Sequence, residues 1–310
     1  MKNLTAFLKT FCGPVLLILA GMAFGYFATL KAYPPSPHSE GKPAASVQLK
    51  CITISPDDRI YVGGSFGIAE VNTDLQLKSL FELPEVAQAL AADTEGNFYI
   101  GYPAAIEKRD SKGDLLLRWG RGGCGGDAFS YVTGIAVDAS NVFVADAGLR
   151  TVFRFSTDGI PLNEISGKTT GATGTGFFVP TPYFDCAVKD QSLYVTNPGC
   201  LRVERYTYKG DLLGYWEQSF DDPDHFPGCS NPTHLAIFPD LHVAASQKGK
   251  AYVRIYTSDG KPVLDLGRDI FPESTRGLDA AVDSKGLLYV VDPHALCVRK
   301  FDISAAAGKS

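Results

Sequence analysis

Hydrophobic and polar residues alternate in a recurring pattern along most of the chain, and this pattern predicts short antiparallel strands. In residues 134–159, GIAVDASNVFVADAGLRTVFRFSTDG, apolar runs at 135–138, 142–145 and 152–155 are separated by Asp, Ser, Asn and Gly. These polar residues and Gly supply the geometry of tight turns. The stretch therefore predicts an antiparallel meander.

The same pattern occurs six times. The copies begin 38, 45, 51, 49 and 45 residues apart, at Cys51, Ala89, Gly134, Asp185, His234 and Asp279. Because each copy makes a small sheet that must stack on its neighbours, the sequence predicts an all-β, six-bladed β-propeller over residues 46–304. The inner strands are expected near 52–55, 89–92, 135–138, 186–189, 235–238 and 279–282.

The repeat also resembles that of a known family. The order GIAVD, VFVAD, a basic and aromatic third strand, then STDG resembles the NHL repeat, and WGRGGCGGDAF at 119–129 resembles that family's Gly-rich approach to the next blade. The resemblance covers residues 50–304. It implies the propeller fold and leaves the activity open, since NHL propellers serve as enzymes, sensors and protein- or RNA-binding platforms.

The sixth copy ends without a fourth strand, and an open sheet edge is a liability. An N-terminal strand is expected to complete this blade, with residues 47–50 as the candidate. Because Cys51 already begins an inner strand, two alternatives stay open: a closing strand at 40–48, or closure by the tail at 304–310.

The N-terminus predicts a membrane anchor. The 21 residues between Lys9 and Lys31 are uncharged, and as a helix they would span about 31 Å, enough to cross the hydrocarbon core. We expect residues 1–31 to form this anchor, with a transmembrane helix within residues 11–30. Residues 32–45, which are rich in Pro, Ser and Gly, are expected to form a tether, and residues 305–310 are expected to form a tail.

A cleaved signal peptide is the alternative to the anchor. It requires small residues at two positions before the cleavage site. The small residues Ala28 and Ala32 could end such a peptide, but Tyr26 and Leu30, two positions before them, are large. Neither site therefore fits the pattern well. The lysines before the apolar run favour a cytoplasmic N-terminus. The propeller is then expected on the extracytoplasmic side, periplasmic or extracellular, of a single-pass membrane protein.

The longest loops are expected on one face of the propeller. In a four-stranded meander, the loops before the first strand and between the second and third strands share a face. The surface formed by these loops, which we call the long-loop face, comprises residues 120–133, 147–149, 166–183, 198–200, 219–233 and 293–296. Because loops on rigid scaffolds carry binding residues, the candidate binding residues are Arg121, Asp127, Arg150, Tyr183, His225, His234 and His294.

Three cysteines follow glycines in loops of the long-loop face, namely Cys124, Cys200 and Cys229. Outside the cytoplasm, Cys200 and Cys229 are candidates for a disulfide. Alternatively, the three thiolates and His234 could bind a soft metal or an Fe–S centre. No C-x-x-C spacing supports that site, so no cofactor is predicted, and separate free thiols are the third possibility.

The charge of the chain bears on its partners. A formal net charge of −5 and a pI of about 5.6 argue against a nucleic-acid partner. The leading hypothesis is a non-enzymatic binding, scaffold or sensor module whose long-loop face recognises a protein or a cell-envelope ligand. The alternatives are a metal-dependent lyase or hydrolase with an axial site, and a cysteine-based redox or metal cofactor protein.

Overall fold

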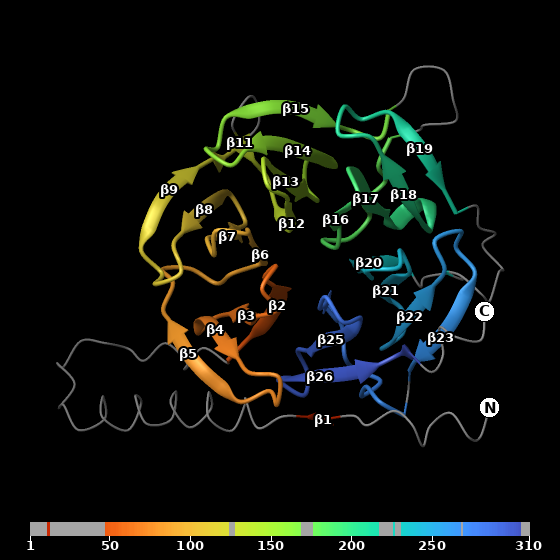
Figure 1. Ribbon diagram of the computed structural model, residues 1–310. Helices are drawn as coiled ribbons and strands as arrows, with labels where there is room; N and C mark the ends of the chain where they lie inside the picture. Colours follow the sequence, from red (N-terminus) through yellow and green to blue (C-terminus); the bar gives the residue numbers. More distant parts are fainter. Residues whose placement is uncertain are drawn as a thin grey trace, which may run out of the picture.

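Six four-stranded sheets surround a central axis in the computed structural model, which describes residues 11–12, 47–123, 128–168, 176–216, 226, 231–267 and 269–304 (Figure 1). This arrangement confirms the all-β, six-bladed propeller. The described blades run from Leu49 to Asp302, and all six inner strands lie within three residues of their predicted positions.

Within each blade the strands follow one another outward from the axis. Blade one comprises β2 (Leu49–Ile54), β3 (Ile60–Gly64), β4 (Gly67–Val71) and β5 (Leu77–Phe81). Blade two comprises β6 (Ala89–Ala92), β7 (Phe98–Tyr102), β8 (Ala105–Arg109) and β9 (Leu115–Trp119). Blade three comprises β12 (Val132–Val137), β13 (Asn141–Asp146), β14 (Thr151–Ser156) and β15 (Pro161–Ile165).

The second half of the chain repeats this order. Blade four comprises β16 (Cys186–Lys189), β17 (Ser192–Asn197), β18 (Arg202–Tyr206) and β19 (Leu212–Tyr215), with a 3-10 turn, η1, at Pro198–Cys200. Blade five comprises β20 (Pro232–Ile237), β21 (Val243–Gln247), β22 (Val253–Tyr256) and β23 (Pro262–Leu266). Blade six comprises β24 (Ala280–Val282), β25 (Leu287–Asp292), β26 (Cys297–Asp302) and the short β1 (Phe11–Cys12). A small parallel pair, β10 (Arg121–Gly122) and β11 (Ala128–Phe129), lies before blade three.

Blade six is completed by β1, where Phe11 pairs with Lys300 and Cys12 with Arg299. The prediction that residues 47–50 close this blade is wrong. Leu49 is buried and pairs with Gly64, so these residues lead into the inner strand of blade one. The first and last blades also share one buried apolar cluster, which includes Leu49, Val62, Tyr289 and Val298 and joins the ends of the ring.

The predicted anchor (1–31), tether (32–45) and tail (305–310) lie outside the described residues, except for Phe11 and Cys12, which form a strand. Among the described parts of the chain, no helix is long and apolar enough to cross a membrane.

Aspartates repeated between the strands hold the turns. Asp138 accepts hydrogen bonds from the backbone N–H groups of Ser140 and Asn141, at 2.9 and 2.8 Å. Asp146 is fully buried and accepts from the backbone N–H groups of Ser130 and Tyr131, at 2.7 and 3.0 Å. These carboxylates satisfy backbone donors that turns leave unpaired, which explains why Asp recurs at equivalent positions. Asp146 also holds the segment that leads into the inner strand of its own blade.

Candidate functional site

The six positions that begin the sequence repeats lie at equivalent places, within the inner strand or directly before it. In every blade the next residue pairs with an equivalent residue of the second strand. Blades one to three place Cys51, Ala89 and Gly134 there, and blades four to six place Asp185, His234 and Asp279. At this position of the repeat, blades one to three therefore carry no Asp or His, whereas blades four to six carry three such side chains in a row.

Asp185, His234 and Asp279, here called the axial trio, converge at the axis. Nδ1 of His234 lies 3.6 Å from Oδ2 of Asp185 and 3.7 Å from Oδ1 of Asp279. One possible ligand atom from each side chain lies within 4.8 Å of the other two. The three side chains are only 10, 12 and 14% exposed, in chain order, so water screens their charges weakly.

Both carboxylates of the axial trio are held by backbone donors of the following blade. Oδ2 of Asp185 accepts from the N–H of Leu235 at 3.0 Å, and Oδ2 of Asp279 accepts from the N–H of Ile52 at 2.9 Å. The first bond joins blade four to blade five, and the second joins blade six to blade one. The carboxylates thus hold the ring together and are themselves fixed in orientation.

Gly134 provides the space that Asp185 occupies. A Cβ atom added to Gly134 would lie 2.3 Å from Oδ1 of Asp185. Only glycine lets the carboxylate approach the neighbouring inner strand so closely. Blade three therefore contributes to the site through the absence of a side chain at Gly134.

Burial and mutual charge shift the pKa values of two members of the axial trio, His234 and Asp279. Burial alone would lower the pKa of His234, but the nearby Asp279 and Asp185 carboxylates outweigh it and raise that pKa above its usual value. Burial raises the pKa of Asp279 to about 6, which His234 opposes and Asp185 reinforces. A positive ion at this position would favour the ionised carboxylates and compete with these protons.

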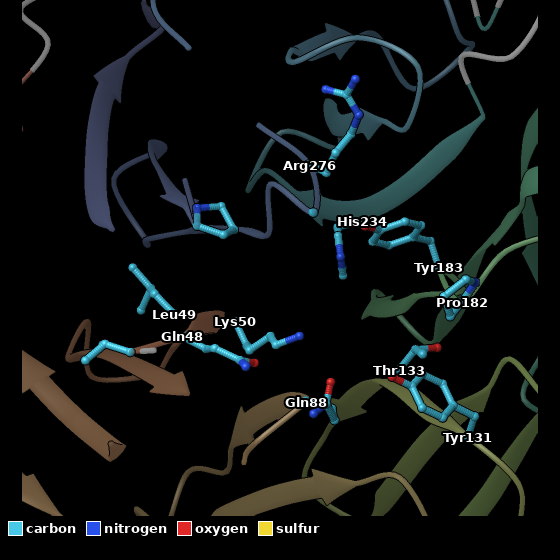
Figure 2. Close-up of a pocket in the computed structure, with 13 residues that line it drawn as sticks. Gln48, Leu49, Lys50, Gln88, Tyr131, Thr133, Pro182, Tyr183, His234 and Arg276 are labelled. Carbon is cyan, nitrogen blue, oxygen red and sulfur yellow. The ribbon is translucent and has the colours of Figure 1, made fainter. Parts of the chain in front are cut away.

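His234 of the axial trio lies between two cavities. The first, here called the upper cavity, has a volume of about 420 Å³ and opens on the long-loop face, and His234 forms part of its wall. Along the axis, a second space of about 220 Å³ is lined by the inner strands and by all three members of the trio. The other polar residues that line the upper cavity are Gln48, Lys50, Gln88, Tyr131, Thr133, Tyr183 and Arg276 (Figure 2).

Irregular pairing in alternate inner strands supplies three of these cavity residues. The register shifts between Leu49 and Cys51 in β2, between Val132 and Gly134 in β12, and between Pro232 and Leu235 in β20. The residues within these three shifts include Lys50, Thr133 and His234. Because a bulge redirects side chains, these shifts explain why the residues line the cavity rather than the packed surface between blades.

Of the residues predicted on the long-loop face, the structure brings Tyr183 and His234 together in the cavity wall. Their rings are edge-to-face, with centroids 6.0 Å apart. The exposed guanidinium of Arg150 lies 6.0 Å from the ring centroid of Phe178, and neither residue lines the cavity. His294 is exposed beside Pro293, a cavity residue.

The remaining predicted binding residues are Arg121, Asp127 and His225. Arg121 is an exposed residue of β10. Asp127 and His225 lie outside the described residues.

The described cysteines differ in their burial. Cys51, Cys186 and Cys297 are buried, and burial raises the pKa of the first two thiols. Cys200 ends η1 and is half-buried, whereas Cys124 and Cys229 lie outside the described residues. The Cys200–Cys229 disulfide and the cysteine-based metal site stay predictions. Within the described part of the chain, the group of possible metal ligands around His234 consists of carboxylates.

Sequence reasoning found His234 but missed Asp185 and Asp279 as its partners. The signal was present, because all three residues begin a repeat, in three successive copies. Equivalent positions on the inner strands of a propeller face the same axis, so a run of ionisable residues at one repeat position predicts a cluster.

No family model matches the chain, and no curated protein matches it. Solved structures do. A streptogramin B lyase is 13% identical, with a TM-score of 0.58, covering 85% of this chain and 96% of the lyase. XC5397, a gluconolactonase from Xanthomonas campestris, is 17% identical, with a TM-score of 0.60 and coverage of 83 and 86%. The WD40 propeller of Doa1 is 14% identical, with a TM-score of 0.57 and coverage of 82 and 78%. At these identities the likeness shows the fold alone, and the NHL resemblance stays a sequence-based prediction.

Proposed function

We propose that the protein is a divalent-metal-dependent hydrolase or lyase, with the axial trio as its metal site and the upper cavity as its substrate site. One observation carries the proposal: two carboxylates and an imidazole from three successive blades converge, and the imidazole also lines a cavity of about 420 Å³. Cavities of roughly 300–1,000 Å³ accommodate small-molecule ligands. This favours the axial enzyme over a module that acts only through its loops.

The donor set fits a small divalent cation. Carboxylate oxygen and imidazole nitrogen bind such metals at roughly 2.0–2.2 Å, which places ligand atoms about 3–4 Å apart. The 3.6 and 3.7 Å distances from His234 to the two carboxylates are in this range. Three protein ligands would leave coordination positions for water and substrate, as in catalytic sites. The mixture of oxygen and nitrogen ligands suits Mn²⁺ or Zn²⁺.

The chain itself would contribute rigidity and orientation. The backbone N–H groups of Leu235 and Ile52 hold the two carboxylates, and the ring of Tyr183 packs edge-on against His234. A bound metal would supply Lewis acidity to a substrate carbonyl or to water. The lyase and the lactonase of similar fold support an enzyme by analogy only.

Metal titration tests the proposal. Protein freed of metal with a chelator should bind Mn²⁺ at one site in isothermal titration calorimetry. His234→Gln and Asp279→Asn should each weaken binding at least tenfold, because each removes a ligand atom. The matched control is His242→Gln, which changes a histidine of the β20–β21 turn. Binding no tighter than millimolar for both Mn²⁺ and Zn²⁺, or equal affinity in all variants, would reject the metal site.

A second candidate keeps the sequence-based hypothesis, a membrane-anchored, extracytoplasmic module that binds a protein or cell-envelope ligand without catalysis. The observation that favours it is the pair of large aromatic side chains, Tyr131 and Phe178, which are 37 and 51% exposed in loops of the long-loop face. Protease treatment of intact cells lacking an outer envelope tests the topology. A protected propeller, or one released in soluble form after processing, would contradict the anchor.

A further inference from the structure

The cavity above the axial trio is cationic on its walls. Lys50 and Arg276 line it, and among the described residues that surround it no Asp or Glu does. Its other polar walls are uncharged amides, hydroxyls and phenols, together with His234. A metal of charge +2 bound to the two carboxylates would neutralise the trio and leave these cations uncompensated. The field in the cavity would then favour an anion.

Lys50 owes its position to the irregular pairing of β2. Leu49 pairs with Gly64 and Cys51 with Gly63, which leaves Lys50 as the extra residue of a bulge. Its neighbours Leu49 and Cys51 are 2 and 1% exposed, packed into the apolar clusters on either side of blade one. The backbone of Lys50 is therefore fixed. Figure 2 shows its amino group directed into the space between His234, Gln88 and Thr133.

The two cations differ in what they contact. The guanidinium of Arg276 donates to the backbone carbonyls of Glu273 and Thr275, at 2.8 and 2.7 Å, and is directed away from the centre of the cavity (Figure 2). Among the described residues, no carboxylate lies within salt-bridge distance of Lys50. Lys50 is thus the charge available to a ligand, and Arg276 belongs to the rim.

We propose that the substrate of this site is a small organic acid whose carboxylate binds the ammonium of Lys50 while its reacting group lies over the axial trio. The substrate class rests on the proposed function. A single ammonium suits a carboxylate of one charge, whereas phosphate sites use several backbone N–H groups or a guanidinium fork. The amide of Gln88 can donate to a hydroxyl or carbonyl oxygen of the same ligand, whereas the hydroxyl of Thr133, which donates to the carbonyl of Phe184 at 2.6 Å, can accept from a ligand hydroxyl.

The experiment compares anions with neutral molecules of the same shape. Acetate, succinate and citrate, their amides, and inorganic phosphate are titrated by calorimetry into Mn²⁺-loaded and into metal-free protein. At least one carboxylate should bind ten times more tightly than its amide and than phosphate. Lys50→Gln should remove this preference, Lys50→Arg should retain most of it, and Lys112→Gln, which changes an exposed turn lysine, should leave it intact. Circular dichroism confirms that each variant is folded.

The outcomes separate this inference from the metal site. A Lys50-dependent preference for carboxylates in metal-free protein, without metal binding, would keep the anion site and reject the metal-dependent enzyme. Metal binding with no preference for a carboxylate over its amide, or with an equal preference in Lys50→Gln, would overturn the inference and leave the metal site standing. Tighter binding of phosphate than of every carboxylate would also overturn the substrate class.

Discussion

Replacing Asp279 by Asn should change the pH dependence of folding stability in a defined direction. Burial raises the pKa of Asp279 from 3.8 to about 6. Between these two pH values the folded protein binds more protons than the unfolded chain. Stability contributed by this group is therefore complete at low pH and is lost as the pH rises toward 6.

The magnitude follows from the shift. About 2 pKa units, at about 1.4 kcal/mol each, give a loss of up to about 3 kcal/mol between pH 4 and pH 7 in metal-free protein. The raised pKa of His234 acts in the same direction, because its contribution is present below about 6.5 and is lost as the pH rises through the folded value. In Asp279→Asn the carboxylate is absent and His234 loses an attracting charge, so both contributions shrink.

Asn also loses one of two oxygen acceptors for the N–H groups of Ile52 and Ala280. This costs about 1–3 kcal/mol. The cost is nearly independent of pH, so the difference in stability between variant and wild type isolates the titration. That difference should move in favour of the variant by up to about 3 kcal/mol from pH 4 to pH 7.5.

Urea unfolding of metal-free protein, followed by the fluorescence of Trp119 and Trp216, measures this difference. Asp158→Asn, which changes an exposed turn carboxylate, is the control and should show little pH dependence relative to wild type. A difference for Asp279→Asn that is constant with pH, or that moves against the variant as the pH rises, would refute the electrostatic reasoning.

Three further predictions concern packing, a buried ion pair and the thiols. Gly134→Ala places a Cβ atom 2.3 Å from a carboxylate oxygen of Asp185 and should therefore weaken Mn²⁺ binding at least tenfold in calorimetry. The control is Gly214→Ala, because a Cβ atom added there has no neighbour within 4 Å and should leave the affinity unchanged. Equal Mn²⁺ affinities in the two variants would contradict the close approach of Asp185 to Gly134. Glu204→Ala removes a carboxylate that is 2% exposed and paired with the guanidinium of Arg202. It should lower the free energy of unfolding in urea by about 3–5 kcal/mol, because it leaves the charge of Arg202 without its partner. A loss below about 1 kcal/mol would show that the pair contributes little to stability. If Cys200 and Cys229 form a disulfide, mass spectrometry without reductant should show the cross-linked peptides, and alkylation of both thiols would reject it.

The sequence predicted the fold well because the physical signal is repeated. Each copy needs apolar inner strands and polar turns, so six noisy patterns reinforce one another and fix the number of blades. The role of Asp138 in a turn followed from the same repetition, and its hydrogen bonds confirm it.

The site was predicted only in part because it depends on contacts between blades. His234 was recognised as a candidate binding residue, but Asp185 and Asp279 meet it only when the ring is closed. Lys50 was assigned to a closing strand, since one extra residue in β2 decides where its side chain lies and leaves no mark on the apolar pattern. A two-residue strand such as β1 is likewise too short to stand out within an apolar run.

The most direct test of the metal centre is anomalous diffraction from crystals soaked in Mn²⁺. An anomalous peak is expected at the axis, within about 2.0–2.3 Å of one oxygen from each carboxylate of the axial trio and of the imidazole nitrogen of His234. The peak should disappear in crystals of His234→Gln. A structure in which Mn²⁺ binds elsewhere, or in which the trio stays metal-free at millimolar Mn²⁺ and neutral pH, would contradict the proposed centre.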